Sequence, residues 1–133
     1  MRDPGAVEIS VPDVLALVEA FEPIADGRAV ASVEQTVELL QYAAYPFDRV
    51  NYDPGHVTAS AAVLSPDRQH VLLVYHERLG LWLQPGGHVE ASDATVQDTA
   101  RREVHEETGI LLDGDQSSSL VTVDVHEIPA VQG

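Results

Sequence analysis

The chain has 133 residues and a mass of 14.4 kDa, which is enough for one domain and hardly for two. It contains no cysteine, which excludes a disulfide scaffold, thiolate zinc sites and cysteine nucleophiles. Its 22 acidic residues outnumber 7 basic ones, all of them arginine, and the formal net charge of −15 disfavours binding to nucleic-acid phosphates.

Residues 1–55 are predicted to form a helical extension. Ser10 and Asp13 have the spacing of a capping box, and the apolar residues that follow recur with the period of an α-helix. A second helix is predicted to begin at the capping pattern of Ser32 and to end before Pro46. Both helices are expected to serve in packing or as a surface for a partner.

Residues 56–133 change to the composition of strands and turns. His56–Leu64 and Val71–Tyr75 are rich in aliphatic and β-branched residues, and the turn-forming residues between them predict a hairpin. Leu81–Leu83 predicts a short third strand. Leu120–Glu127 alternates apolar and polar residues and predicts a further strand near the C-terminus.

A helix is predicted from Asp93 to Thr108, with Gly109 as its left-handed cap. At 100° per residue, Glu103 and Glu107 fall at the edge of its apolar face, and Glu106 lies just outside it. Like charges four residues apart and acidic side chains in a last turn both destabilise a helix. Hard divalent cations prefer such oxygen ligands, so a metal site explains the cluster better than a solvated face neutralised by neighbouring arginines. Such ions would also let a substrate that carries phosphates approach this acidic protein.

The segment Gly87–Ile110 resembles the signature of the Nudix hydrolases, G-x(5)-E-x(7)-R-E-U-x-E-E-x-G-U, in which U is aliphatic. Its second half, Arg102–Ile110, matches without a gap. In the first half, Asp93 stands where the family has glutamate, and eight residues rather than seven separate it from Arg102. Asp93 also suits a helix N-cap. The departure leaves open whether Arg102 forms the salt bridge that usually orients it in this family.

The resemblance covers about residues 56–127. It implies an α/β fold, an α/β/α sandwich around a mixed sheet, and metal-dependent hydrolysis of a diphosphate linkage in a nucleoside diphosphate derivative. The implied cofactor is Mg²⁺ or Mn²⁺. Arg102 would neutralise and orient the carboxylates, and Glu103 is the favoured general base in some relatives. The implied metal ligands are the Gly86 carbonyl and the side chains of Glu103, Glu106 and Glu107.

Other conspicuous residues are less informative. Arg78 is a candidate for contact with a substrate phosphate, because it and Arg68 are the only basic residues near the predicted sheet, but a solvated loop arginine is the commoner case. Trp82 is expected in the core because leucines flank it. The histidines of this region, including His88, lack the spacing of metal ligands and are expected in surface or loop roles.

Two other functions fit the same fold. A Nudix-like domain can act as a non-catalytic nucleotide sensor, but such domains often lose motif carboxylates that this chain keeps. Isopentenyl diphosphate isomerases share the fold and the metal motif, but their chemistry relies on a cysteine, which this chain lacks. Turnover by the purified protein with Mg²⁺ separates an enzyme from a sensor.

The region after Ile110 is short for this fold, so we expect a second chain or further sequence to complete it. A homodimer is predicted, formed through the edge of Leu120–Glu127 and the apolar stripes of the N-terminal helices. No apolar stretch is long enough for a signal peptide or a membrane span. We therefore expect a cytoplasmic protein that binds a small molecule and contacts neither a membrane nor a nucleic-acid duplex.

Overall fold

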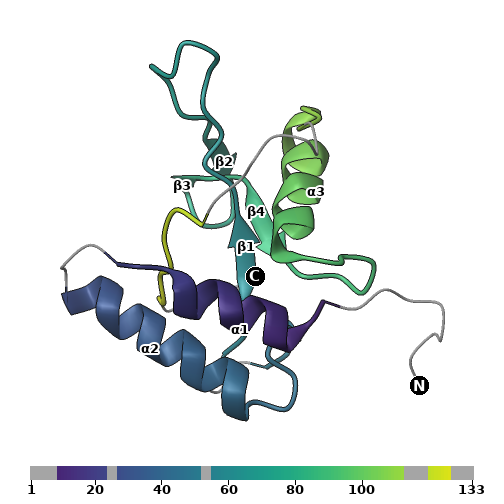
Figure 1. The fold of residues 1–133 in the computed structure, drawn as a ribbon. Helices are drawn as coiled ribbons and strands as arrows, with labels where there is room; N and C mark the ends of the chain where they lie inside the picture. Colours follow the sequence, from purple (N-terminus) through teal and green to yellow (C-terminus); the bar gives the residue numbers. More distant parts are fainter. Residues whose placement is uncertain (1–8, 24–26, 52–54, 113–119, 127–133) are drawn as a thin grey trace.

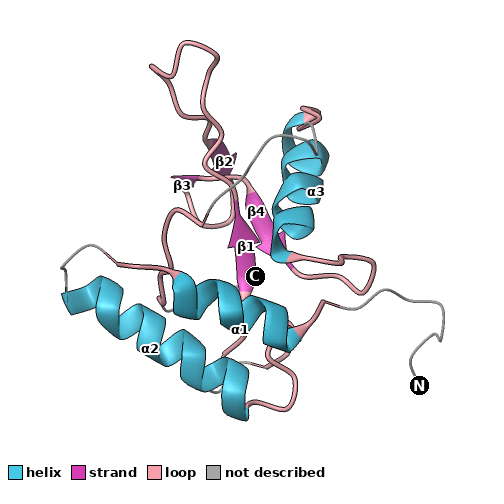
Figure 2. Ribbon diagram, viewed as in Figure 1, coloured by secondary structure: helices cyan, strands magenta, loops and turns pink. Residues whose placement is uncertain are grey.

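The computed structural model describes residues 9–23, 27–51, 55–112 and 120–126. Two N-terminal helices lie side by side in the lower half of the view, and two small antiparallel sheets and a third helix lie above them (Figures 1 and 2). The elements in chain order are α1 (Val11–Ala20), α2 (Gly27–Tyr42), β1 (Thr58–Ser60), β2 (Val74–His76), β3 (Leu81–Leu83), β4 (Gly86–His88) and α3 (Val96–Thr108). This is the α/β class predicted from the sequence. The described strands pair only in antiparallel fashion, so the mixed sheet of the sandwich stays a prediction.

The first helix begins where its capping signal predicts. The Ser10 hydroxyl accepts a hydrogen bond from the backbone N–H of Asp13 at 3.3 Å, which satisfies one of the free donors at the start of α1. A proline in the first turn fits there because it needs no hydrogen-bond partner for a backbone N–H. The local signal was therefore sufficient to locate α1.

The second helix begins earlier than predicted. It starts at Gly27, so Ser32 lies inside α2 and does not cap it. Ser32 is 3% exposed, and its hydroxyl accepts a hydrogen bond from the backbone N–H of Val125 at 3.1 Å. The capping pattern was misleading because the alanine-containing turn before Ser32 is itself favourable for a helix. The helix ends at Tyr42, before Pro46, as predicted.

The helical layer contains the main apolar core of the described residues. Val14 and Val18 of α1 pack with Leu40 of α2, and each of the three is at most 5% exposed. Val57 and Val96, from beyond the helical layer, pack against the same cluster. None of the helices in the described part of the chain is long and apolar enough to cross a membrane.

The first sheet joins β1 to β4, with Ala59 opposite Gly87. This pairing corrects the predicted hairpin, in which the strand after His56 pairs with Val71–Tyr75. One isolated bridge between Leu64 and Val71 is all that the structure forms of that ladder. Helix α3 packs on β1 and β4, so this sheet forms the platform beneath the acidic helix.

The second sheet is a hairpin of β2 and β3, in which Tyr75 lies opposite Trp82. The prediction of a strand at Leu81–Leu83 is confirmed. The prediction that Trp82 is a core residue is wrong, because 65% of its surface is exposed. Its flanking leucines are also exposed, so the apolar run marks a surface and not an interior.

The segment 120–126 is not a strand, which corrects the prediction for Leu120–Glu127; Glu127 itself lies outside the described residues. Val123 packs against the helical core, and Asp124 forms an ion pair with Arg28 of α2 at 3.3 Å. Of the alternating valines, Val123 packs on the helical layer, whereas Val121 and Val125 are exposed. The edge that was predicted to form a dimer is absent at these residues.

Candidate metal centre

The acidic helix α3 has defined ends. Thr95 caps its start by accepting a hydrogen bond from the backbone N–H of Asp98 at 3.1 Å, and Gly109 closes it with a left-handed φ of 78°. The cap at Gly109 is as predicted. The helix begins at Val96, so the prediction that Asp93 starts and caps it is wrong: the Asp93 carboxylate is occupied elsewhere.

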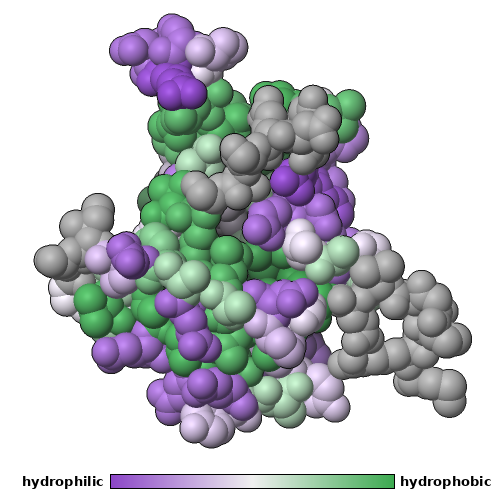
Figure 3. Space-filling model, in the orientation of Figure 1, coloured by the Kyte–Doolittle hydropathy of each residue, from purple (hydrophilic) through white to green (hydrophobic). Residues whose placement is uncertain are grey.

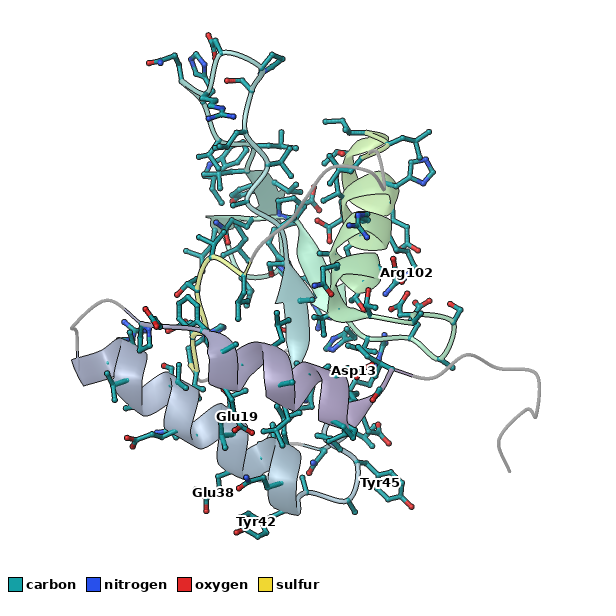
Figure 4. The ribbon with its side chains drawn as sticks, viewed as in Figure 1. Asp13, Glu19, Glu38, Tyr42, Tyr45 and Arg102 are labelled. Atoms are coloured by element: carbon teal, nitrogen blue, oxygen red, sulfur yellow. The ribbon has the colours of Figure 1, made fainter. Side chains whose placement is uncertain are left out.

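Arg102 holds that carboxylate at two points. Its Nε lies 3.1 Å from Oδ1 of Asp93 and its Nη2 lies 3.0 Å from Oδ2. Arg102 extends from α3 toward the loop before the helix (Figure 4), where Nη2 also donates to the His88 carbonyl at 2.8 Å. The Asp93 N–H donates to the Glu90 carbonyl at 2.9 Å and closes a turn. This turn accommodates the one residue by which the segment exceeds the Nudix signature. The salt bridge left open by the sequence therefore forms.

The environment of Asp93 favours its ionised form. Asp93 is 4% exposed, and this burial by itself raises the pKa of its carboxyl group. Hydrogen bonds from Arg102, from the backbone N–H of Glu90 at 2.9 Å and from the Thr99 hydroxyl at 2.8 Å outweigh burial, so the pKa is lowered. The ion pair with Asp93 correspondingly raises the pKa of Arg102.

Glu103 and Glu107 converge beside the glycine pair of β4. The Glu103 carboxylate lies against Gly87, where an added Cβ would be 2.7 Å from its carboxyl carbon. Glu107 lies near Glu103, one turn further along α3. Partial loss of solvent and the nearby Glu103 raise the pKa of Glu107, although much of the residue is exposed; the Gly86 N–H opposes this.

A family model, the NUDIX domain, matches residues 54–129 of this chain. The chain belongs to the Nudix family. No curated protein and no solved structure shows significant similarity to it. The match includes all four strands and α3, and leaves α1 and α2 outside the Nudix domain.

The third carboxylate of the Nudix motif points elsewhere. The Glu106 side chain is 54% exposed and pairs with Arg102 at 3.2 Å. Among the described residues, no three acidic or histidine side chains lie close enough together to hold a metal ion. Two carboxylates such as Glu103 and Glu107 would still be compatible with Mg²⁺, because this ion commonly uses one or two protein carboxylates and takes its other ligands from water and phosphate.

Arg78, the candidate for substrate binding, lies in the exposed turn between β2 and β3. In the described part of the chain it forms no ion pair with the Nudix carboxylates. The sequence analysis did not single out Glu90, whose carboxylate lies 3.4 Å from Nη1 of Arg102. Its position three residues after the glycine pair was the available signal.

A histidine pair also escaped the sequence analysis. His56 Nε2 lies 3.2 Å from His88 Nδ1, and His56 Nδ1 lies 3.2 Å from the Asn51 carbonyl. A carbonyl only accepts, so His56 Nδ1 donates the hydrogen bond to Asn51. Burial, and the charges of Arg49 and His56, lower the pKa of His88. The contact between the two histidines connects β4 to the segment between α2 and β1.

Proposed function

We propose that this Nudix protein hydrolyses a diphosphate linkage in a nucleoside diphosphate derivative, with Mg²⁺ or Mn²⁺ as cofactor. Residues 56–133 would form the catalytic unit and residues 1–55 a helical extension. The observation that carries the proposal is the Glu103 carboxylate lying against Gly87, with Glu107 near enough that Glu103 raises its pKa. Membership of the Nudix family supports the class of reaction.

In this proposal, Glu103, Glu107 and the Gly86 carbonyl hold the metal. When bound, the ion offsets the charge of the substrate diphosphate and activates water for attack. Arg102 fixes the position of Glu103 through their contact at 3.0 Å, while Asp93 fixes the position of Arg102. Glu103 stays the candidate for the general base, and it is held in place by the same two contacts.

Glu106 would contact the metal only after a change of its side-chain position. Its side chain is paired with Arg102 and faces solvent, so it can join the metal only after it gives up part of that ion pair. Because the Glu106 side chain is 54% exposed, water can replace its contact with Arg102 when it moves. We therefore assign Glu106 to a second ion or to the substrate-bound state, and Glu103 with Glu107 to the first ion.

The test is a panel of substrates offered to the purified chain with Mg²⁺: nucleoside triphosphates, ADP-ribose, dinucleoside polyphosphates and nucleotide sugars. The reaction is run in isotopically labelled water and the products are analysed by mass spectrometry. Hydrolysis places the label in a phosphate product. Binding without turnover for every member of the panel would instead support the nucleotide sensor and refute the enzyme.

A further inference from the structure

Two half-buried histidines connect the N-terminal part of the chain to the strand that borders the candidate metal centre. His56 lies in the segment between α2 and β1, and its Nε2 is 3.2 Å from Nδ1 of His88 in β4. The other ring nitrogen of His56, Nδ1, donates to the Asn51 carbonyl at 3.2 Å. Asn51 lies outside residues 54–129, which match the Nudix domain. The histidine pair is therefore a connection from the helical extension into the Nudix domain.

His88 also contacts Arg102, through its backbone. It is the last residue of β4, where it lies opposite Thr58 of β1. The His88 carbonyl accepts a hydrogen bond from Nη2 of Arg102 at 2.8 Å. That nitrogen also donates to Asp93 at 3.0 Å, while Nη1 lies 3.0 Å from the Glu103 carboxylate. Nη2 is thus held by the segment before α3, and Nη1 is presented to a candidate metal ligand.

The helix that carries the carboxylates presents a hydrophilic face. Figure 3 shows this surface to the right of centre in the upper half of the view, where Figure 1 places α3. Side chains on such a face can adopt several rotamers unless neighbouring groups restrict them. Groups that lie behind a metal ligand provide this restriction, and their loss typically weakens metal binding about 10- to 100-fold. The contacts behind Glu103 are therefore expected to determine how well it binds an ion.

We propose that His56 is a positioning residue for the metal centre. Its ring contact holds His88 at the end of β4. The His88 carbonyl in turn holds Arg102, which orients Glu103. The inference rests on the proposed function for the role of Glu103. It extends the site to a residue outside the Nudix signature, and it gives the helical extension a part in forming the metal centre.

Two substitutions separate the roles of the two ring nitrogens of His56. In His56→Gln, the side-chain amide reaches about the position of Nε2 and can keep the contact with His88. In His56→Asn, the shorter side chain reaches about the position of Nδ1, so it can keep the contact with Asn51 but loses that with His88. An amide can donate or accept, so the comparison holds for either direction of the hydrogen bond between the histidines. Ser32→Ala is the control for a general loss of stability, because it removes a buried contact with Val125 in the helical layer.

Exchange of the Arg102 guanidinium protons with water, measured by NMR, reports how firmly Arg102 is held without metal or substrate. We expect faster exchange in His56→Asn, and wild-type exchange in His56→Gln and Ser32→Ala. Mn²⁺ affinity, measured by titration calorimetry, should fall about tenfold in His56→Asn alone. In a turnover assay with saturating Mg²⁺, kcat should fall in the same variant while KM stays unchanged, because His56 acts through Arg102 and not on the substrate.

Wild-type exchange or wild-type Mn²⁺ affinity in His56→Asn would overturn the inference. Equal losses in His56→Gln or in Ser32→Ala would also overturn it, because the contact with His88 would then not be the cause. Absence of turnover in the wild type would contradict the proposed function instead, and the guanidinium exchange would still decide the role of His56. Circular dichroism checks that each variant folds. If His56→Asn does not fold, His88→Leu removes the same contact from the side of β4, and the same losses are expected.

Discussion

Asp93 and Arg102 form a two-point ion pair across a segment that is one residue longer than the Nudix signature requires. The shorter aspartate side chain reaches the guanidinium because the turn from Glu90 to Asp93 brings its backbone close to α3. Asp93 is 4% exposed, and the Arg102 side chain is 19% exposed. The pair therefore fixes the position of Arg102, and Arg102 in turn orients Glu103.

Replacing Asp93 tests this pair. Asp93→Asn leaves Arg102 without its main counter-charge in a largely buried place, and we expect the free energy of unfolding to fall by about 2–4 kcal/mol. Asp98→Asn is the control, because it breaks an exposed ion pair with Arg101 on the same helix and should cost less than about 1 kcal/mol. Urea unfolding measures both. Equal losses in the two variants would contradict the structural role of Asp93.

The lowered pKa of Asp93 predicts how stability depends on pH. A group whose folded pKa is lowered stabilises the fold above its ordinary value, which is 3.8 for this carboxyl, and loses that contribution as the pH falls through the folded value. The difference in unfolding free energy between the wild type and Asp93→Asn should be constant near neutral pH and should shrink under acid conditions. Urea unfolding over a pH series measures it. A difference that grows on acidification would show that the pKa is raised.

Thr99 is expected to act on Asp93 through its hydroxyl. Thr99 is fully buried and donates to Oδ2 of Asp93 at 2.8 Å. Thr99→Val removes that donor and should raise the Asp93 pKa toward its ordinary value, whereas Thr99→Ser retains the hydroxyl and should leave the pKa low. Carbon-detected NMR titration of the carboxyl group reports the pKa directly. Serine and valine variants with the same Asp93 pKa would rule out the hydroxyl as the cause.

Gly87 is expected to be needed for the position of Glu103. A Cβ at Gly87 would lie 2.7 Å from the Glu103 carboxyl carbon, so Gly87→Ala should displace the carboxylate and weaken metal binding at least about tenfold, with the fold retained. Gly27→Ala is the control, because nothing lies within 4 Å of an added Cβ there. Titration calorimetry with Mn²⁺ compares the two. Unchanged affinity in Gly87→Ala would show that the carboxylate is not a ligand.

Local signals in the sequence predicted local structure well. Ser10 and Gly109 mark helix ends through hydrogen bonds and backbone angles within a few residues, and both predictions are confirmed. Ser32 failed because an equally good helical sequence precedes it. Strand pairing was also missed. A composition rich in aliphatic and β-branched residues shows that a segment such as 56–64 can form a strand, but it carries no information about which strand lies beside it.

In the candidate site, too, some contacts could be predicted from the sequence and others could not. The i, i+4 spacing of Glu103 and Glu107 places both on one face of α3, so their proximity followed from the sequence. The ion pair of Glu106 with Arg102 has the same i, i+4 spacing, and it agrees with the implied role of Arg102 in neutralising the carboxylates. The Asp93 pair depended on the geometry of a turn that the extra residue alters. Contacts set by helix periodicity are predictable, and contacts set by loops need the structure.

The central claim, a metal centre on Glu103 and Glu107, is tested most directly by steady-state turnover across a range of Mg²⁺ concentrations. The comparison uses wild type, Glu107→Gln and Glu38→Gln, in which Glu38 is an exposed glutamate of α2 (Figure 4). We expect no turnover without the ion, wild-type behaviour in Glu38→Gln, and a loss of at least about a hundredfold in Glu107→Gln. The melting temperature of Glu107→Gln should not fall, because its carboxylate is disfavoured beside Glu103. Wild-type turnover and Mg²⁺ dependence in Glu107→Gln would contradict the account.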